Sequence, residues 1–213
     1  VGEISNTGFE LLLTGSPIYQ RNFQWDATVA LSTNNNELVS WGDAPLTEIS
    51  FGSFATVQKH IPGYPLGGFW AVDVERDANG EPVLTNGNVT VESDPSYVGP
   101  SLPTREIGFT NVFTLFNNFR VFANLDYKGG NYQWCAICSI RSRIDRNTQL
   151  INDPDTDPTE VLVVRSLQTR RWIKEADFIK LREVSLSYTL PGDLTSRIGV
   201  NNATVTLSGR NLW

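Results

Sequence analysis

Two cysteines three residues apart are the first feature of this sequence that could do chemistry. Cys135 and Cys138 are its only cysteines, and such a pair can bind zinc, exchange thiols or form a structural disulfide. Zinc needs about four ligands, and His60 is the only histidine. A thioredoxin-like site would need a strand before the pair and a helix after it, whereas we expect a loop rich in Gly and Arg. The pattern therefore predicts a short-range disulfide in an oxidising compartment, or two bystander thiols, and no metal.

Alternating aspartates are a second candidate, for a calcium loop. Asp153, Asp155 and Asp157 have the spacing with which such a loop begins. Pro158 stands where the loop needs its turn glycine, and Val164 where it needs a bidentate glutamate. These two substitutions of the EF-hand pattern argue against an EF-hand. Two alternatives remain, a looser calcium contact or a solvated acidic loop.

Four aromatic residues in the long segments between predicted strands could contact a ligand or a partner protein. They are Trp41, Tyr64, Trp70 and Trp134. A large flat apolar ring with a polar handle stacks well on a sugar ring or a protein surface. The same rings could instead pack the long segments against one another, and the sequence leaves both roles open.

No catalytic set can be assembled from the remaining residues. His60 is alone in a long segment, so nothing marks it as a general base. Gly63, Gly67 and Gly68 lack the Lys-Ser/Thr ending of a phosphate-binding loop, and no helical pattern follows them, which predicts turn residues. We therefore expect no enzyme activity and no cofactor.

Composition narrows the class of protein without deciding it. The net charge of −6 argues against a nucleic-acid partner. No apolar run approaches the ~20 residues of a membrane-spanning helix, but a transmembrane β-strand needs only roughly 10 residues with every second one apolar. The sequence has no initiator Met or leader before Val1, and it stops at Trp213 directly after a strand-like run. We expect a piece of a longer protein.

Hydrophobic alternation with a period of two predicts the elements that must carry these residues. In residues 23–32, Phe23, Trp25 and Val29 fall on one face, and polar residues fall on the other. Residues 119–127 alternate in the same way. The predicted strands lie near 8–16, 22–33, 106–117, 118–129, 176–190 and 201–211.

The connections between these strands alternate in length. Short ones at 16–19, 117–118 and 191–201 separate long ones at 34–105 and 130–175. Outer-membrane barrels have tight periplasmic turns and long outer loops, whereas such long connections are uncommon in compact domains. The expected fold is all-β, an antiparallel transmembrane β-barrel segment of about six strands from a larger barrel with long extracellular loops. A soluble antiparallel sheet with one buried face, such as a β-rich carbohydrate-binding module, is the alternative.

The phase of the alternation assigns side chains to two solvents. Three residues are predicted to face lipid and three to face the barrel lumen: Val29, Val121 and Leu207 for lipid, and Thr28, Asn124 and Thr206 for the lumen.

Six phrases in the same order resemble those of the SusC/RagA branch of TonB-dependent transporters. Residues 1–10 resemble a "GEI-N-GFE" phrase, and residues 62–70 a "GYPxGxF" phrase. Residues 172–191 resemble a Phe-x-Lys-Leu-Arg segment before a strand that ends in Tyr-x-Leu-Pro. The other phrases are 97–103, 127–131 and 211–212. The acidic stretch 148–160 and the cysteine pair depart from the family pattern.

The resemblance implies a transport conduit without catalytic residues, in the outer membrane of a Gram-negative bacterium. Residues 1–213 would be the C-terminal portion of the barrel, with the plug domain and the remaining strands outside this chain. A SusD-like surface lipoprotein would cover the outer mouth and help to capture a glycan or peptide. TonB would act through the absent N-terminal region.

Overall fold

The computed structural model describes residues 2–52, 57–197 and 199–213. The chain forms two compact units. The sheet unit consists of Gly8–Asn34, Pro103–Gly129 and Asp177–Trp213, and the loop unit of Val1–Thr7, Asn35–Leu102 and Gly130–Ala176. Val1 of the first family phrase, residues 53–56 of the first long connection and residue 198 of the last short one lie outside the described residues.

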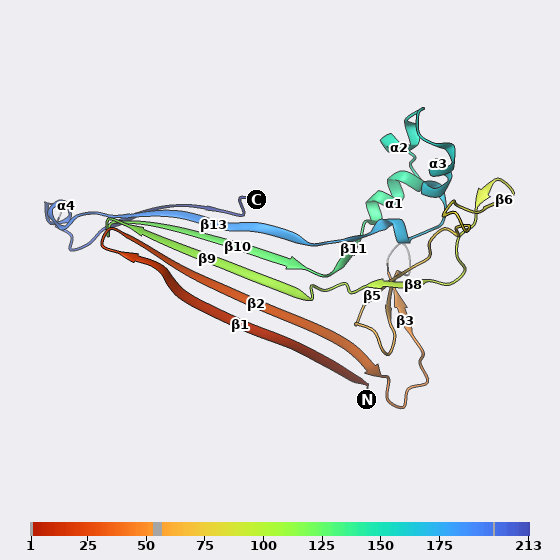
Figure 1. Cartoon of the computed structure of the whole chain (residues 1–213), viewed down its shortest axis with the longest axis horizontal. Coiled ribbons are helices and arrows are strands. Elements are labelled where there is room, and N and C mark those ends of the chain that lie inside the picture. The colour runs from red at the N-terminus through yellow and green to blue at the C-terminus, as the bar shows by residue number, and fades with distance from the viewer. Residues whose placement is uncertain (1, 53–56, 198) are drawn as a thin grey trace. The chain divides into compact units, whose positions relative to one another are not determined.

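Six long strands form one antiparallel sheet in the order β1-β2-β9-β10-β13-β14 (Figure 1). Each strand neighbours the next of the six along the chain, and all six strands predicted from alternation are confirmed. Their bounds are β1 Glu3–Gln20, β2 Phe23–Ser40, β9 Arg105–Leu115, β10 Phe119–Gly129, β13 Phe178–Thr189 and β14 Thr204–Arg210. The sheet is open, with β1 and β14 as its edges.

One predicted turn was wrong. Residues 16–19 lie inside β1, and the turn to β2 is Arg21-Asn22. Ser16-Pro17 usually marks a turn, but proline removes only one amide donor and is tolerated in an edge strand such as β1. The turn predicted at 117–118 is confirmed, with Phe116 and Asn117 in the left-handed region at φ 50° and 63°. The third connection, 191–201, contains the short helix α4, Gly192–Arg197.

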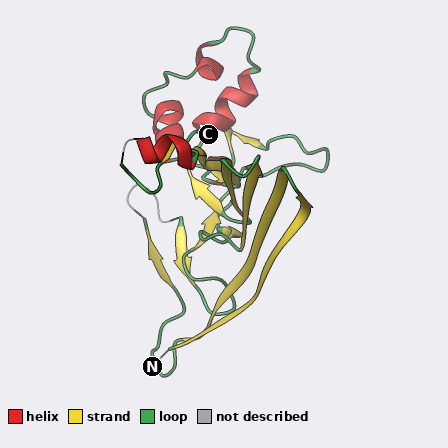
Figure 2. Ribbon diagram, turned by 90° about the vertical axis from the view of Figure 1, so that its left-hand side faces the viewer, coloured by secondary structure: helices red, strands yellow, loops and turns green. Residues whose placement is uncertain are grey.

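The loop unit has secondary structure of its own, which the sequence reading did not predict. Figure 2 distinguishes the helices of the chain, in red, from its strands, in yellow. Its strands are β3 Ile49–Phe51, β4 Gln58–His60, β5 Gly68–Ala71, β6 Leu84–Thr85, β7 Asn88–Val89, β8 Ser96–Gly99, β11 Tyr132–Trp134 and β12 Ile173–Glu175. Its helices are α1 Ala136–Arg143, α2 Gln149–Asn152, α3 Pro158–Arg165 and the 3-10 helix η1 Arg170–Trp172. No described helix has the length and apolar character to cross a membrane.

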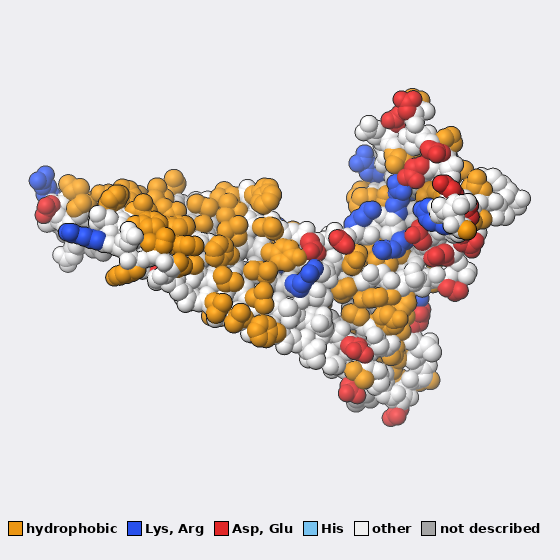
Figure 3. All heavy atoms as spheres, in the orientation of Figure 1, with side chains coloured by type: hydrophobic (Ala, Val, Ile, Leu, Met, Phe, Trp, Pro, Cys, Tyr) orange, Lys and Arg blue, Asp and Glu red, His pale blue; other side chains and the backbone are white. Residues whose placement is uncertain are grey.

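The two units bury apolar side chains very differently. Within the described residues, every buried hydrophobic side chain belongs to the loop unit: Leu38, Val57, Phe69, Ala71, Val74, Val163, Val164, Trp172 and Ile173. In the sheet unit large apolar residues remain exposed, among them Leu13 at 57%, Ile179 at 53% and Leu207 at 76%. Figure 3 shows hydrophobic side chains gathered over the strands of this unit. The sheet therefore has an apolar face whose large side chains are exposed.

Candidate functional site

The strand register sorts the side chains of the sheet into an apolar face and a polar face. Val121 pairs with Phe113 of β9 and with Leu186 of β13, and Leu186 pairs in turn with Leu207 of β14. Trp25 of β2 also pairs with Phe113, and their rings stack with centroids 6.0 Å apart. Because alternate residues share a face, Val29 lies on this apolar face with Trp25.

The polar face carries the three residues predicted for the lumen. Thr28 pairs with Thr110, and Thr110 pairs with Asn124. Thr206 pairs with Ser187, and their hydroxyl oxygens are 2.9 Å apart. The predicted grouping of side chains by face is therefore confirmed, while the assignment of one face to lipid and the other to water stays a prediction.

Charged side chains of the polar face are paired across strands. Arg182 donates from Nε to Asp126 Oδ2 at 3.0 Å, and Lys128 Nζ donates to Glu106 Oε2 at 2.9 Å. Arg182 is the extra residue of a bulge, because the register between β10 and β13 shifts after Asn124. Paired charges and hydroxyl ladders suit a surface in contact with water.

A shallow depression of about 580 Å³ lies on this polar face. Its floor is Ala30 and Gly108, where a Cβ added to Gly108 would meet only the Ala30 Cβ, at 3.8 Å. Glu10, Glu106 and Asp126 contribute carboxylates to its wall. Glu106 and Asp126 already have cationic partners. Leucines also line the depression, so its surface is mixed in polarity and is not a cation site.

Asn111 is a polar residue in the middle of the apolar face. Asn111 pairs with Ala27 and Ala123, which share that face, and is only 6% exposed. Its Oδ1 accepts a hydrogen bond of 3.1 Å from the indole nitrogen of Trp25. The bond satisfies the indole N–H, which would otherwise lack a partner in an apolar medium.

Two of the four predicted contact residues, Tyr64 and Trp70, form an aromatic cluster in the loop unit. Their ring centroids are 4.7 Å apart in an edge-on arrangement, and Tyr97 lies 4.8 Å from Tyr64 and 5.4 Å from Trp70. Sequence reasoning missed Tyr97 as a member, although it begins the family phrase 97–103. Gly68 makes room for it, since an added Cβ would come within 2.8 Å of the Tyr97 ring.

The other two predicted residues lie elsewhere in the loop unit. Trp134 packs against the core formed by Val57, Phe69, Ala71 and Ile173. Trp41 is half-buried, and among the described residues no ring contact is found for it. Packing thus accounts for three of the four aromatic residues, and a ligand contact by any of them stays a prediction.

Three ionisable groups of the loop unit have shifted pKa values. Burial raises the pKa of Tyr97, and the nearby Tyr132 and Tyr64 add to the effect, so its hydroxyl remains protonated at neutral pH. A hydrogen bond from Lys59 lowers the pKa of Glu48, with help from Ser50.

Asp77 is the third of these groups. Backbone amides of Glu81 and Asn79 lower the pKa of Asp77 by donating to its carboxylate at 2.9 and 2.8 Å. The carboxylate thereby closes the turn at Gly80, whose φ is 87°.

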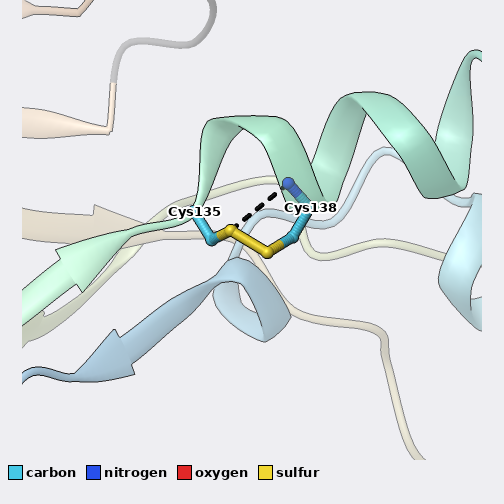
Figure 4. The surroundings of a disulfide bond; sticks show 2 residues. All are labelled: Cys135 and Cys138. Carbon is cyan, nitrogen blue, oxygen red and sulfur yellow. Dashed lines mark hydrogen bonds between the residues drawn. A yellow bond between two sulfur atoms is a disulfide. The ribbon is translucent and has the colours of Figure 1, made fainter.

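Cys135 and Cys138 are joined as a disulfide at the start of α1, with Cα atoms 5.2 Å apart (Figure 4). Cys135 is the N-cap, and its sulfur accepts a hydrogen bond from the Cys138 amide at 3.3 Å. The expected loop-like surroundings were wrong, because β11 precedes the pair and α1 follows it. A three-residue strand and an eight-residue helix are too short to show their periodicity in the sequence. β11 pairs only with β12 in a two-stranded sheet, unlike the βαβ setting of thioredoxin-like motifs.

Reduction of this disulfide should have a local effect. The bond closes a loop of only a few residues, so the chain-entropy contribution is about 2 kcal/mol, below that of longer loops. Limited proteolysis of the full-length protein with and without dithiothreitol measures it. We expect cleavage within residues 130–176 to become faster by up to about thirtyfold, with unchanged cleavage of the sheet. The variant Cys135→Ser/Cys138→Ser should match the reduced protein. Global unfolding on reduction would contradict this.

The aspartates of the acidic stretch serve as local hydrogen-bond acceptors. Asp157 caps α3 by accepting from the Thr159 amide at 2.7 Å, and Asp153 accepts from the Asp155 amide at 3.0 Å. Among the described residues, no group of three or more His, Cys, Asp or Glu side chains is placed to hold a metal ion.

His60 also has a structural place, in β4. Its Nδ1 accepts a hydrogen bond of 2.9 Å from the Gly67 amide, and its ring lies 4.8 Å from that of Phe51. Gly63 and Gly67 adopt φ values of 87° and 64°, which confirms their prediction as turn residues. The same prediction was wrong for Gly68, which is the first residue of strand β5.

Comparison with known proteins identifies similar chains, although no protein-family model matches. The TonB-dependent receptor P26 of Formosa agariphila is 26% identical over the whole chain, which covers 25% of that relative. The TonB-dependent receptor SusC of Bacteroides thetaiotaomicron is 24% identical over 89% of the chain and 21% of the relative. The chain thus spans about a quarter of the length of these relatives.

Solved structures share the fold over the whole chain. The RagAB peptide importer in its closed-closed state gives a TM-score of 0.78 at 18% identity, with 26% of that chain covered. Its open-open state gives 0.72 at 19% identity, with 25% covered.

The fold and the two faces define the class of structure, an antiparallel β-sheet segment that matches part of a TonB-dependent receptor barrel. The sheet is not closed, as is expected for a segment of a barrel. The chain resembles the SusC/RagA-type TonB-dependent transporters in both sequence and fold, so the resemblance drawn from the six phrases is confirmed.

Proposed function

We propose that residues 1–213 are the C-terminal portion of the barrel of a TonB-dependent outer-membrane transporter, with the plug domain and the remaining strands in other parts of the full-length protein. The observation that carries the proposal is the exposed apolar face of the sheet. Phe9, Leu13 and Val205 are more than half exposed on or beside that face. Lipid is the medium in which such a face is stable without a covering layer.

Strand length and the open edges agree with this proposal. β9 and β10 have 11 residues each and β13 has 12, close to the roughly 9–11 residues that a tilted transmembrane strand needs. β1 and β14 leave unpaired backbone groups that hydrocarbon does not tolerate. Further strands of the same protein would pair with them and close the barrel.

The transported nutrient is a glycan or a peptide too large for passive diffusion, captured together with a SusD-like surface lipoprotein. Support comes from the resemblance to SusC and to a peptide importer. TonB supplies the energy through a region outside this chain. The barrel is a conduit and not an enzyme.

A soluble carbohydrate-binding module is disfavoured by the same observation. Such a module buries one sheet face in a core, whereas the described part of the sheet unit contains no buried hydrophobic side chain. The apolar face would be left in water.

Two experiments in the host test the proposal: fractionation of cells that contain the full-length protein, and deletion of its gene. We expect the protein to fractionate with the outer membrane and to migrate faster on a gel before boiling than after it, as a closed barrel does. We also expect the deletion strain to lose growth on at least one oligosaccharide or peptide mixture, and to keep growth on the corresponding monomers.

Complementation supplies the control. The intact gene should restore growth, and a version with a deleted TonB-contacting segment should not. Recovery of the protein in the soluble fraction, or normal growth of the deletion strain on every polymer of a broad panel, would refute the proposal.

A further inference from the structure

Three arginines of the loop unit line one small pocket. Arg143 comes from the end of α1, Arg165 from the end of α3, and Arg146 from the segment that follows α1. Asn88 and Ser166 add polar groups to the wall of the pocket, whose volume is about 200 Å³. Figure 3 shows Lys and Arg side chains gathered in the region of these helices.

None of the three arginines has a carboxylate partner among the described residues. Other arginines of the chain do have one, such as Arg171 with Glu160 at 2.6 Å and Arg182 with Asp126. The Nε of Arg143 is buried without a hydrogen-bond partner in the described chain, and its Nη1 reaches only Ser139 Oγ, at 3.5 Å. Arg143 is partly buried, and Arg146 and Arg165 are exposed. Their guanidinium groups therefore have donors available for an anion in the pocket, and such an anion could also satisfy the buried Nε of Arg143.

The backbone around Arg146 is fixed by hydrogen bonds. Arg146 has φ 54°, a left-handed conformation that is uncommon for a residue other than glycine. The side-chain amide of Asn152 donates to the Arg146 carbonyl at 3.0 Å, and the backbone amide of Asn147 donates to the Arg141 carbonyl at 3.0 Å. These bonds hold the Arg146 backbone beside the end of α1.

The partial negative charges at the C-termini of α1 and α3 are too small to balance the three arginines of the pocket. The C-terminus of a helix carries roughly half a negative charge, so the ends of α1 and α3 together supply about one. Three guanidinium groups exceed this, and Arg146 lies outside both helices. The pocket therefore remains positive, in a chain whose net charge is −6.

We propose that this arginine pocket binds one anionic group, a carboxylate or a sulfate, of the transported nutrient. Guanidinium groups recognise oxyanions through paired, charge-assisted hydrogen bonds. A volume of about 200 Å³ is below the roughly 300–1,000 Å³ of sites that enclose a whole small molecule, so it fits a single substituent. The identification of the anion as part of a nutrient rests on the proposed transport function.

The test measures binding of small probes to the purified full-length protein in detergent, by saturation-transfer NMR at low salt. Glucuronate is compared with glucose, and N-acetylglutamate with N-acetylglutamine, so that the probes of each pair differ chiefly in charge. We expect the acids to bind and the neutral partners not to bind. Arg143→Gln and Arg165→Gln should each weaken binding of the acids by at least about tenfold.

The matched control is Arg141→Gln, which removes a charge from the same helix but outside the pocket. Arg141 donates to Asn147 Oδ1 at 3.2 Å. The substitution Arg141→Gln should leave binding of the acids unchanged. Heat-dependent gel migration verifies that every variant keeps a folded barrel. Equal losses in Arg141→Gln and Arg143→Gln, or equal binding of glucose and glucuronate, would overturn the proposal.

A lipid headgroup is the other source of the same anion chemistry. The same variants are therefore tested for binding of lipopolysaccharide, with the protein in nanodiscs. If Arg143→Gln weakens binding of lipopolysaccharide and the acids do not bind at all, the nutrient assignment is wrong. These measurements do not require transport, so they remain interpretable if the growth test of the proposed function fails. If the growth test supports transport and the acids do not bind, the anion-binding proposal is refuted and the proposed transport function stands.

Discussion

Arginine in place of Val29 should lower the stability of the full-length barrel by about 2–4 kcal/mol, the cost of a cation near the midplane of the bilayer on the lipid-facing side. Val29 lies in the middle of its paired stretch of β2, opposite Phe109 of β9, which itself pairs with Leu125 of β10. Asn111, which pairs with Ala27, is the nearby polar side chain on this face, and its Oδ1 already accepts a hydrogen bond from Trp25. Urea unfolding of the protein refolded into lipid vesicles measures the change, because the folded barrel migrates faster on an unheated gel.

The neighbouring residue provides the matched control. Thr28 is next to Val29 in the chain but points to the opposite face, where its hydroxyl lies 3.1 Å from that of Thr14. Thr28→Arg should therefore change the free energy of unfolding by less than about 1 kcal/mol, since the new charge can remain in water. A larger loss in Thr28→Arg than in Val29→Arg would mean that the polar face is the one in contact with lipid.

The sheet could be predicted from the sequence because each strand shows its own alternation of apolar and polar residues. A strand between two different solvents must alternate apolar and polar side chains, and this pattern is visible in residues 23–32 and 119–127 without knowledge of any contact. The same pattern fixed the grouping by face, because a shift of one residue would reverse every side chain. Asn111 and the polar-face residue Phe122 are two of the residues that break the alternation. Asn111 has Trp25 as a partner on its own face, and Phe122 has Arg120, whose guanidinium carbon lies 5.9 Å from the ring centroid.

The loop unit could not be predicted in this way because its contacts are long-range. Trp134 and Ile173 pack with Val57 and Phe69 in one core, although along the chain Trp134 lies 77 residues and Ile173 lies 116 residues after Val57. Strands of two to four residues carry too few positions to show a period. The arginine pocket was missed for the same reason, since Arg143, Arg146 and Arg165 look in sequence like scattered surface charges, and only the packing of α1 and α3 brings them to one pocket.

The two long connections and the tight turns should be exposed on opposite sides of the outer membrane. In a barrel of antiparallel strands, successive connections alternate between the two sides, with tight turns in the periplasm and long loops outside. The described sheet has tight turns at Arg21-Asn22 and at 116–118, and long connections at 41–104 and 130–177. We therefore expect the loop unit, with its aromatic cluster and arginine pocket, to meet nutrients outside the cell.

Cysteine labelling distinguishes the two sides in the full-length protein with Cys135→Ser and Cys138→Ser. Asn79→Cys and Asp155→Cys place a thiol at exposed positions of the two long connections, and Arg21→Cys places one in the exposed turn between β1 and β2. A membrane-impermeant maleimide should label the first two on intact cells. It should label the third only after the outer membrane has been permeabilised, with a change from background to near-complete reaction. Labelling of Arg21→Cys on intact cells, with no reaction at the other two positions, would place the loop unit in the periplasm, where it could not capture a nutrient from outside.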